Sequence, residues 1–145
     1  MTDAPRFELA RSAAGTLAGI VAAGVVIALT ELAWRQLVGA GVGAYDGSSM
    51  SGLVDAAPWY AAVLMLAGLS LAAFAGAWVA SRLGRRGAGP GYAVTVLVAA
   101  AAVARTLIYL QPLWLTLAVA ACAVAAGVLG ARLGRPSERP RVFAG

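Results

Sequence analysis

Residues 92–131 read YAVTVLVAAAAVARTLIYLQPLWLTLAVAACAVAAGVLGA, two apolar runs interrupted by Gln111 and Pro112. Each run is about 20 residues long, which is the length a helix needs to cross the hydrocarbon of a bilayer. A link this short forces neighbouring helices to run antiparallel. This stretch therefore predicts a transmembrane helical hairpin.

The rest of the chain repeats that pattern. Residues 12–34 form one more apolar run and residues 58–81 another, so the predicted spans are 12–34, 58–81, 92–110 and 112–131, with residues 1–11 as a polar arm. The first run is longer than the 7–15-residue core of a cleavable secretion signal, so we expect it to be retained. The prediction is an all-α integral membrane four-helix bundle, a single membrane domain over 1–145, built of two in-out-in hairpins.

Composition supports the bilayer as the main solvent. Of the 145 residues 61% are hydrophobic and 12% charged, far from the averages of soluble domains. The net charge of +5 comes from eleven arginines that mostly flank the apolar runs, where lipid phosphates lie, so we expect membrane lipids and no nucleic acid as partners.

Arginine placement predicts the orientation. Nine arginines lie in the arm, in the loop after the second run and in the tail, whereas Arg35 alone flanks the opposite ends of the runs and Arg105 lies inside a run. The positive-inside rule then places both termini and residues 82–91 in the cytoplasm. We expect a multi-pass protein of the bacterial inner membrane. The aromatic residues Trp34, Trp59, Tyr60, Tyr109 and Trp114 fall at the opposite boundary, as an interfacial belt requires.

Two ionisable residues are predicted to lie within the hydrocarbon. An isolated charge is costly there, so Glu31 and Arg105, which occur at similar depths, are expected to form an intramembrane ion pair. Arg35 competes for Glu31, which it follows by four residues. A polar cluster at nearby depth is expected from six residues, namely Thr30, Arg35, Thr106, Tyr109, Gln111 and Thr116. It could be a structural clamp, a solute or proton site, or a partner-binding site.

Small residues at fourfold spacing predict where the helices pack, because such residues let backbones approach closely in lipid. The glycines assigned to these faces are Gly15, Gly19, Gly68, Gly76 and Gly127. The arginines expected to contact lipid or a partner are Arg82, Arg85, Arg86, Arg132 and Arg135. Their segments also suggest an internal repeat, since Arg-Leu-Gly-Arg occurs at 82–85 and again at 132–135; convergent helix endings explain it equally well.

The residue types needed for most catalysis are scarce. The chain has no histidine and one cysteine, Cys122, inside an apolar run, so no metal site, cofactor or catalytic residue is predicted. We expect a non-enzymatic accessory or structural subunit of a larger membrane complex, with other membrane subunits or further copies of itself as partners. The alternative is a small transporter or channel with Glu31 as its coupling carboxylate.

A resemblance points to the same architecture. The embedded Glu31, the helix ending Gly76-Ala-Trp-Val-Ala-Ser-Arg82 and the start Pro112-Leu-Trp114 loosely resemble a class of small, uncharacterised bacterial four-helix inner-membrane proteins. That resemblance implies architecture and no activity.

Overall fold

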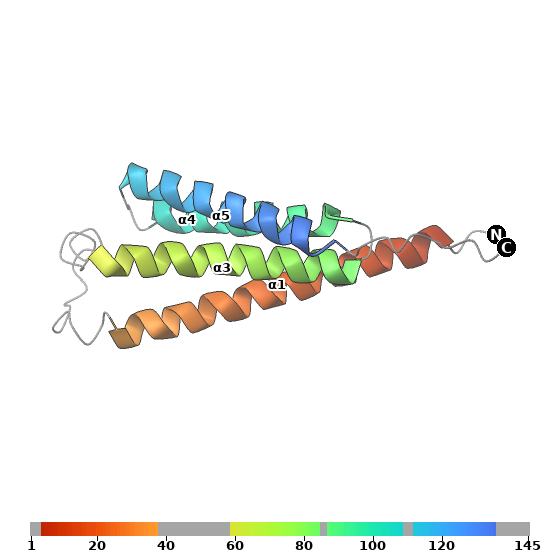
Figure 1. The fold of residues 1–145 in the computed structure, drawn as a ribbon, viewed down its shortest axis with the longest axis horizontal. Helices are drawn as coiled ribbons and strands as arrows, with labels where there is room; N and C mark the ends of the chain where they lie inside the picture. The colour runs from red at the N-terminus through yellow and green to blue at the C-terminus, as the bar shows by residue number, and fades with distance from the viewer. Residues whose placement is uncertain (1–3, 38–58, 85–86, 109–111, 136–145) are drawn as a thin grey trace.

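The computed structural model describes residues 4–37, 59–84, 87–108 and 112–135, and this part of the chain is helical with no strands. Its four helices are α1 (Ala4–Leu37), α3 (Trp59–Gly84), α4 (Gly89–Ile108) and α5 (Leu113–Leu133) (Figure 1). Each contains a segment long and apolar enough to span a membrane: Ala10–Trp34, Ala62–Gly84, Gly89–Ile108 and Leu113–Leu133. The chain is an all-α protein with four candidate membrane-spanning helices.

The start of α1 differs from the sequence prediction. The polar arm expected over residues 1–11 is helical from Ala4 onward, so α1 has 34 residues and is about 51 Å long at 1.5 Å per residue. Pro5 in the first turn has a φ that suits a helix start, and no helix-breaking residue follows before Gly15. The early part of α1 therefore extends beyond the end of α3, as Figure 1 shows.

Close contacts fix the helix directions. Gly15 of α1 lies against Gly84 at the end of α3, and Thr30 lies against Gly68 near its beginning, so α1 and α3 are antiparallel. In α5, Gly127 packs on Thr95 of α4. Since Gly91 of α4 packs near Ala131, α4 and α5 are antiparallel as well.

The remaining neighbours complete the bundle. Gly130 packs on Phe74 and Gly134 on Trp78, which makes α3 and α5 parallel. Consequently the start of α1, the end of α3, the start of α4 and the end of α5 lie at one end of the bundle (Figure 1). This arrangement is the one that two successive hairpins produce.

The core consists mainly of small residues. Alanines dominate the buried hydrophobic positions, including Ala72, Ala73, Ala77, Ala80 and Ala123, while many leucines and valines are exposed on the outside. In a bilayer, outward-facing apolar side chains contact lipid tails, and helices associate through close packing rather than through the hydrophobic effect. The observed distribution suits that solvent.

The five glycines predicted to lie at helix contacts all do so. A Cβ atom built on Gly15 would be 2.7 Å from the Gly84 nitrogen, and one on Gly19 would be 2.5 Å from the Gly76 carbonyl oxygen. A Cβ on Gly76 would in turn be 2.8 Å from the Gly19 carbonyl oxygen. Gly68 packs on Thr30 and Gly127 on Thr95.

The suggested internal repeat does not extend to symmetrical packing. An axis that relates α1 to α4 and α3 to α5 would match each contact between α3 and α4 with one between α5 and α1. The structure has the first contact, whereas α1 and α5 do not touch within the described residues. Helix α1 is thus the peripheral helix, packed on α3 and, less extensively, on α4.

Candidate functional site: an ion pair between α1 and α4

Glu31 and Arg105 meet where α1 and α4 run side by side. The Nη2 atom of Arg105 donates a hydrogen bond to Oε1 of Glu31 at 2.7 Å. This distance is typical of a charge-assisted hydrogen bond between a guanidinium and a carboxylate. The structure therefore contains the helix contact and the pairing expected between these two residues, whereas their functional role stays a prediction.

The pair forms because α1 and α4 are parallel and in register. Gly19 of α1 lies close to Val94 of α4. Glu31 follows Gly19 by twelve residues and Arg105 follows Val94 by eleven, so the two charged residues lie at nearly the same level along the two helices. Each lies three residues before the end of its candidate span, or about 4.5 Å along the helix axis. The two charges therefore lie near the ends of their candidate spans rather than at the middle.

The ion pair lies at the margin of the bundle. The side chain of Arg105 is 37% exposed and that of Glu31 is 42% exposed. Because α1 packs closely on α3 and less on α4, the seam between α1 and α4 leaves these two side chains partly uncovered. A neighbouring molecule could reach both charges from outside the bundle.

Within the expected polar cluster, the hydroxyl groups of Thr30 and Thr106 bond to their own helices and not to each other. The Thr30 hydroxyl donates to the Val26 carbonyl oxygen at 2.8 Å, and that of Thr106 donates to the Val103 carbonyl oxygen at 2.8 Å. Both bonds stay within one helix, a common arrangement for threonine in apolar surroundings. Thr116 is buried. The side chain of Arg35, together with Tyr109 and Gln111, lies outside the described residues.

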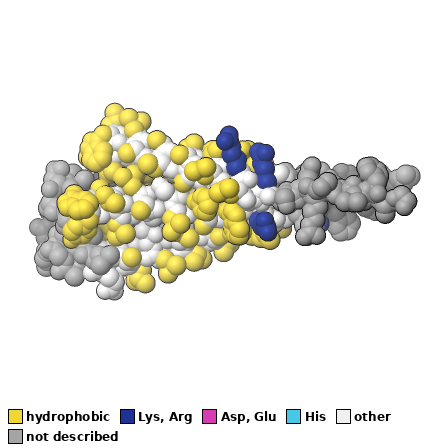
Figure 2. Space-filling model, in the orientation of Figure 1, with side chains coloured by type: hydrophobic (Ala, Val, Ile, Leu, Met, Phe, Trp, Pro, Cys, Tyr) yellow, Lys and Arg dark blue, Asp and Glu magenta, His cyan; other side chains and the backbone are white. Residues whose placement is uncertain are grey.

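The arginines predicted to contact lipid or a partner gather at the opposite end of the bundle. Arg82, Arg132 and Arg135 are exposed, and Figure 2 shows arginine side chains at this end of the described helices. Arg85 and Arg86 lie outside the described residues. Arg135 donates a hydrogen bond from Nη2 to the Tyr92 hydroxyl at 3.4 Å, which links the end of α5 to the start of α4.

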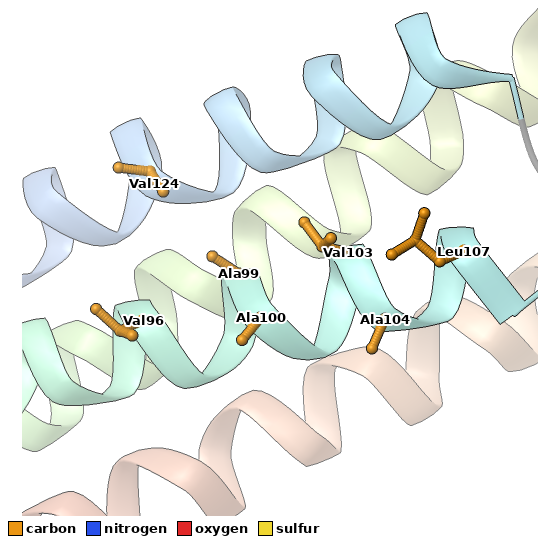
Figure 3. A pocket seen from close by; sticks show the side chains of 7 residues that line it. All are labelled: Val96, Ala99, Ala100, Val103, Ala104, Leu107 and Val124. Atoms are coloured by element: carbon orange, nitrogen blue, oxygen red, sulfur yellow. The ribbon is translucent and has the colours of Figure 1, made fainter.

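Sequence reasoning missed an apolar groove on the outer face of α4. The groove has a volume of about 520 Å³ and is lined by Val96, Ala99, Ala100, Val103, Ala104, Leu107 and Val124 (Figure 3). Six of these residues recur on one face of α4 at helical spacing, and Val124 comes from α5. The signal in the sequence was the alternation of alanine with larger residues, which leaves a hollow between them.

The described residues contain no group of three or more histidine, cysteine, aspartate and glutamate side chains that could hold a metal ion. Cys122 is an exposed free thiol on α5. The Ser81 hydroxyl is buried and has no hydrogen-bond partner among the residues that the structure describes.

Comparison of the chain with models of known protein families, with curated proteins and with solved structures finds no match.

Proposed function

We propose that this chain is a non-enzymatic accessory or structural subunit of a larger membrane protein complex. We place it in the bacterial inner membrane, with both termini and residues 82–91 in the cytoplasm. The arginine distribution supports this orientation through the positive-inside rule. The observation that carries the proposed role is the ion pair of Glu31 and Arg105 at the outside of the bundle.

A partner that covers the ion pair would give its two charged side chains protein contacts. At 42% and 37% exposure the two side chains are joined to each other but still face the surroundings of the bundle. Charged groups within membrane spans usually face protein or a water-filled cavity rather than lipid. A helix of a neighbouring subunit packed over the seam of α1 and α4 would provide protein contacts for both.

The face of α1 that leads to Glu31 suits a partner helix. Gly24 and Ala28 are exposed and spaced by four, and Glu31 follows seven residues after Gly24, which places all three on one side of the helix. Exposed small residues at this spacing permit a second helix to approach closely. The partner contact would therefore run along α1 and end at the ion pair. We name the exposed side of Gly24, Ala28 and Glu31 the α1 face.

Site-specific crosslinking in the native membrane tests the proposal. A photoreactive amino acid replaces Ala28 on the α1 face in the full chain, and the matched control replaces Ala125, which is also exposed but lies on α5. After mild extraction, we expect a discrete adduct between position 28 and another membrane subunit or a second copy of this chain. Position 125 should give no such adduct.

Removing the ion pair is a second test of the proposed subunit role. Glu31→Gln should weaken the complex on a native gel, since the partner would lose its polar contact, while the chain should still insert. Migration of the wild-type chain only as a monomer, without any copurifying protein and with equal crosslinking at positions 28 and 125, would contradict the proposal.

The transporter alternative rests on the same carboxylate. Partial exposure of Glu31 would allow it to bind a proton or cation, yet the hydroxyls of Thr30 and Thr106 bond within their own helices instead of extending a polar path. Unchanged cation flux in proteoliposomes after Glu31→Gln would eliminate this alternative. Loss of flux in a chain that remains monomeric would favour it over the subunit role.

A further inference from the structure

Two guanidinium groups meet at one tyrosine hydroxyl where α4 begins and α5 ends. Nη2 of Arg135 donates a hydrogen bond to the Tyr92 hydroxyl at 3.4 Å, and the side chain of Arg132 is hydrogen-bonded to the same hydroxyl. The backbone N–H of Arg135 also bonds to the Arg132 carbonyl oxygen at 3.3 Å, which keeps the two arginines on one turn. The end of α5 therefore holds two positive charges close together.

The hydroxyl at the centre of this cluster is held in place by packing. The ring of Tyr92 packs against Ala77, Ala88 and Ala131, so α3, α5 and the turn before α4 all position it. A tyrosine hydroxyl that accepts hydrogen bonds from arginine still has its own hydrogen to donate. Arg132, Arg135 and Tyr92 thus present three donor groups side by side at the surface of the bundle.

The positive charge of this cluster is not offset by the acidic side chains that the structure describes. Glu31 is the only carboxylate among the described side chains, and it lies near the opposite end of the bundle beside Arg105. Both guanidinium groups of the cluster are exposed, and like charges at short distance repel each other. An anion bound between Arg132 and Arg135 would offset that repulsion.

The cluster lies at the depth of lipid headgroups if the candidate spans cross a bilayer. Arg132 is the last residue but one of the Leu113–Leu133 span, and Tyr92 follows the start of the Gly89–Ile108 span by three residues. Arginine and tyrosine at the end of a span lie where the phosphates of the lipids are. A ligand could therefore reach the cluster either as a lipid or from the water.

We propose that Arg132, Arg135 and the Tyr92 hydroxyl bind a phosphomonoester group. Such a group has three terminal oxygens and a charge of about −1.5 to −2 at neutral pH, so it matches three donor groups and two guanidinium charges. A phosphodiester has one terminal oxygen and one ionisable proton fewer, so it matches the cluster less well. This binding site goes beyond the proposed subunit role and does not depend on it.

The affinity of the purified full chain for defined ligands tests the proposal, with native mass spectrometry as the measurement. The lipid probes are phosphatidic acid, a phosphomonoester, and phosphatidylglycerol, a phosphodiester, with identical acyl chains. We expect phosphatidic acid to bind about fivefold more tightly. Glycerol 3-phosphate serves as a soluble competitor. If it leaves phosphatidic acid bound, the phosphomonoester is a lipid headgroup; if it displaces phosphatidic acid, the same site takes a soluble phosphomonoester.

Three substitutions and a matched control test the residues of the site. Arg132→Gln and Arg135→Gln should each weaken binding of phosphatidic acid by about fivefold. Tyr92→Phe should weaken it severalfold without changing the charge, and it keeps the ring that packs on the alanines. Arg82→Gln removes an exposed arginine in the last turn of α3, at the same end of the bundle, and should have little effect.

Each of three results would overturn the assignment. Equal affinity for the two lipids would show that the cluster does not select a phosphomonoester. A loss for Arg82→Gln as large as those for Arg132→Gln and Arg135→Gln would show a diffuse attraction of anions to this end of the bundle. Unchanged affinity of the Tyr92→Phe variant would show that the hydroxyl is not a ligand.

Discussion

The contribution of the hydrogen bond between Arg105 and Glu31 to stability depends on the depth of the two residues in the membrane and on their exposure. At the midplane an isolated charge costs roughly 2.5 to 3.5 kcal/mol on insertion scales, and less near the boundary. Both residues lie three positions from the ends of their spans and are more than one third exposed. The net contribution should therefore be modest, and most of it should appear as coupling between the two side chains.

A double-mutant cycle measures that coupling. Glu31→Gln and Arg105→Gln should each lower the free energy of unfolding by about 1 kcal/mol, because each removes the charge-assisted hydrogen bond between the two side chains. The double variant should lose less than the sum of the two. Unfolding of the purified chain in mixed detergent micelles provides the free energies. Strictly additive losses would show that the 2.7 Å contact contributes nothing.

Ser81 offers a stabilising substitution. Its hydroxyl is fully buried with no hydrogen-bond partner in the described part of the chain, and burying a polar group without a bond costs free energy. Ser81→Ala should therefore raise the unfolding free energy by about 1 kcal/mol. On the same helix, Ser70 donates to the Leu66 carbonyl oxygen at 2.7 Å, so Ser70→Ala should not stabilise. Equal melting temperatures for the two variants would contradict this account.

How far single residues could be predicted depends on the signal they leave in the sequence. Two opposite charges in otherwise apolar runs indicate their own pairing, and Glu31 and Arg105 do meet. Hydroxyl residues leave no such signal, because Thr30 and Thr106 can bond to their own helices at any position. The burial of Ser81 depends on how α3 fits against α4 and α5, which a linear pattern does not contain.

Helix α1 is held to α3 by reciprocal small-residue contacts. Gly15, Gly19 and Ala23 of α1 face Gly76, Ala80 and Gly84 of α3, and each series is spaced by four. This spacing was visible in the sequence, although it could not show which helix would receive it. The start of α1 was harder to predict, because a helix that continues from lipid into water keeps no uniform hydropathy.

Two glycines of α1 provide a matched test of this contact. A Cβ on Gly19 would lie 2.5 Å from the Gly76 carbonyl oxygen and 2.7 Å from the Ala80 Cβ, whereas one on Gly24 would meet nothing within 4 Å. Gly19→Ala should therefore destabilise the purified chain by about 1 to 3 kcal/mol through overpacking. Gly24→Ala should be neutral or stabilising, since alanine favours helix. Similar losses in detergent unfolding would show that α1 is not packed as described.

The overall architecture was the most predictable feature because the bilayer imposes it. Backbone groups in lipid must bond within the segment, so an apolar run of about 20 residues becomes a helix, and short links make neighbours antiparallel. The four helices accordingly lie where the runs were, within a few residues except for the start of α1. The suggested repeat did not predict the packing, because α1 contacts α3 and α4 but not α5 in the described chain.

Orientation across the membrane is testable with cysteine labelling, using the single native thiol as an internal control. Cys122 lies within the α5 span and is exposed toward its surroundings, so in intact membranes a membrane-impermeant maleimide should not modify it until detergent is added. In a Cys122→Ala background, Ala144→Cys should react only in inside-out vesicles and Ser49→Cys only in spheroplasts. The physical reason is that the arginines of the tail and of residues 82–91 resist translocation, while residues 38–58 contain no arginine. Labelling of position 144 from outside the cell would reverse the proposed orientation.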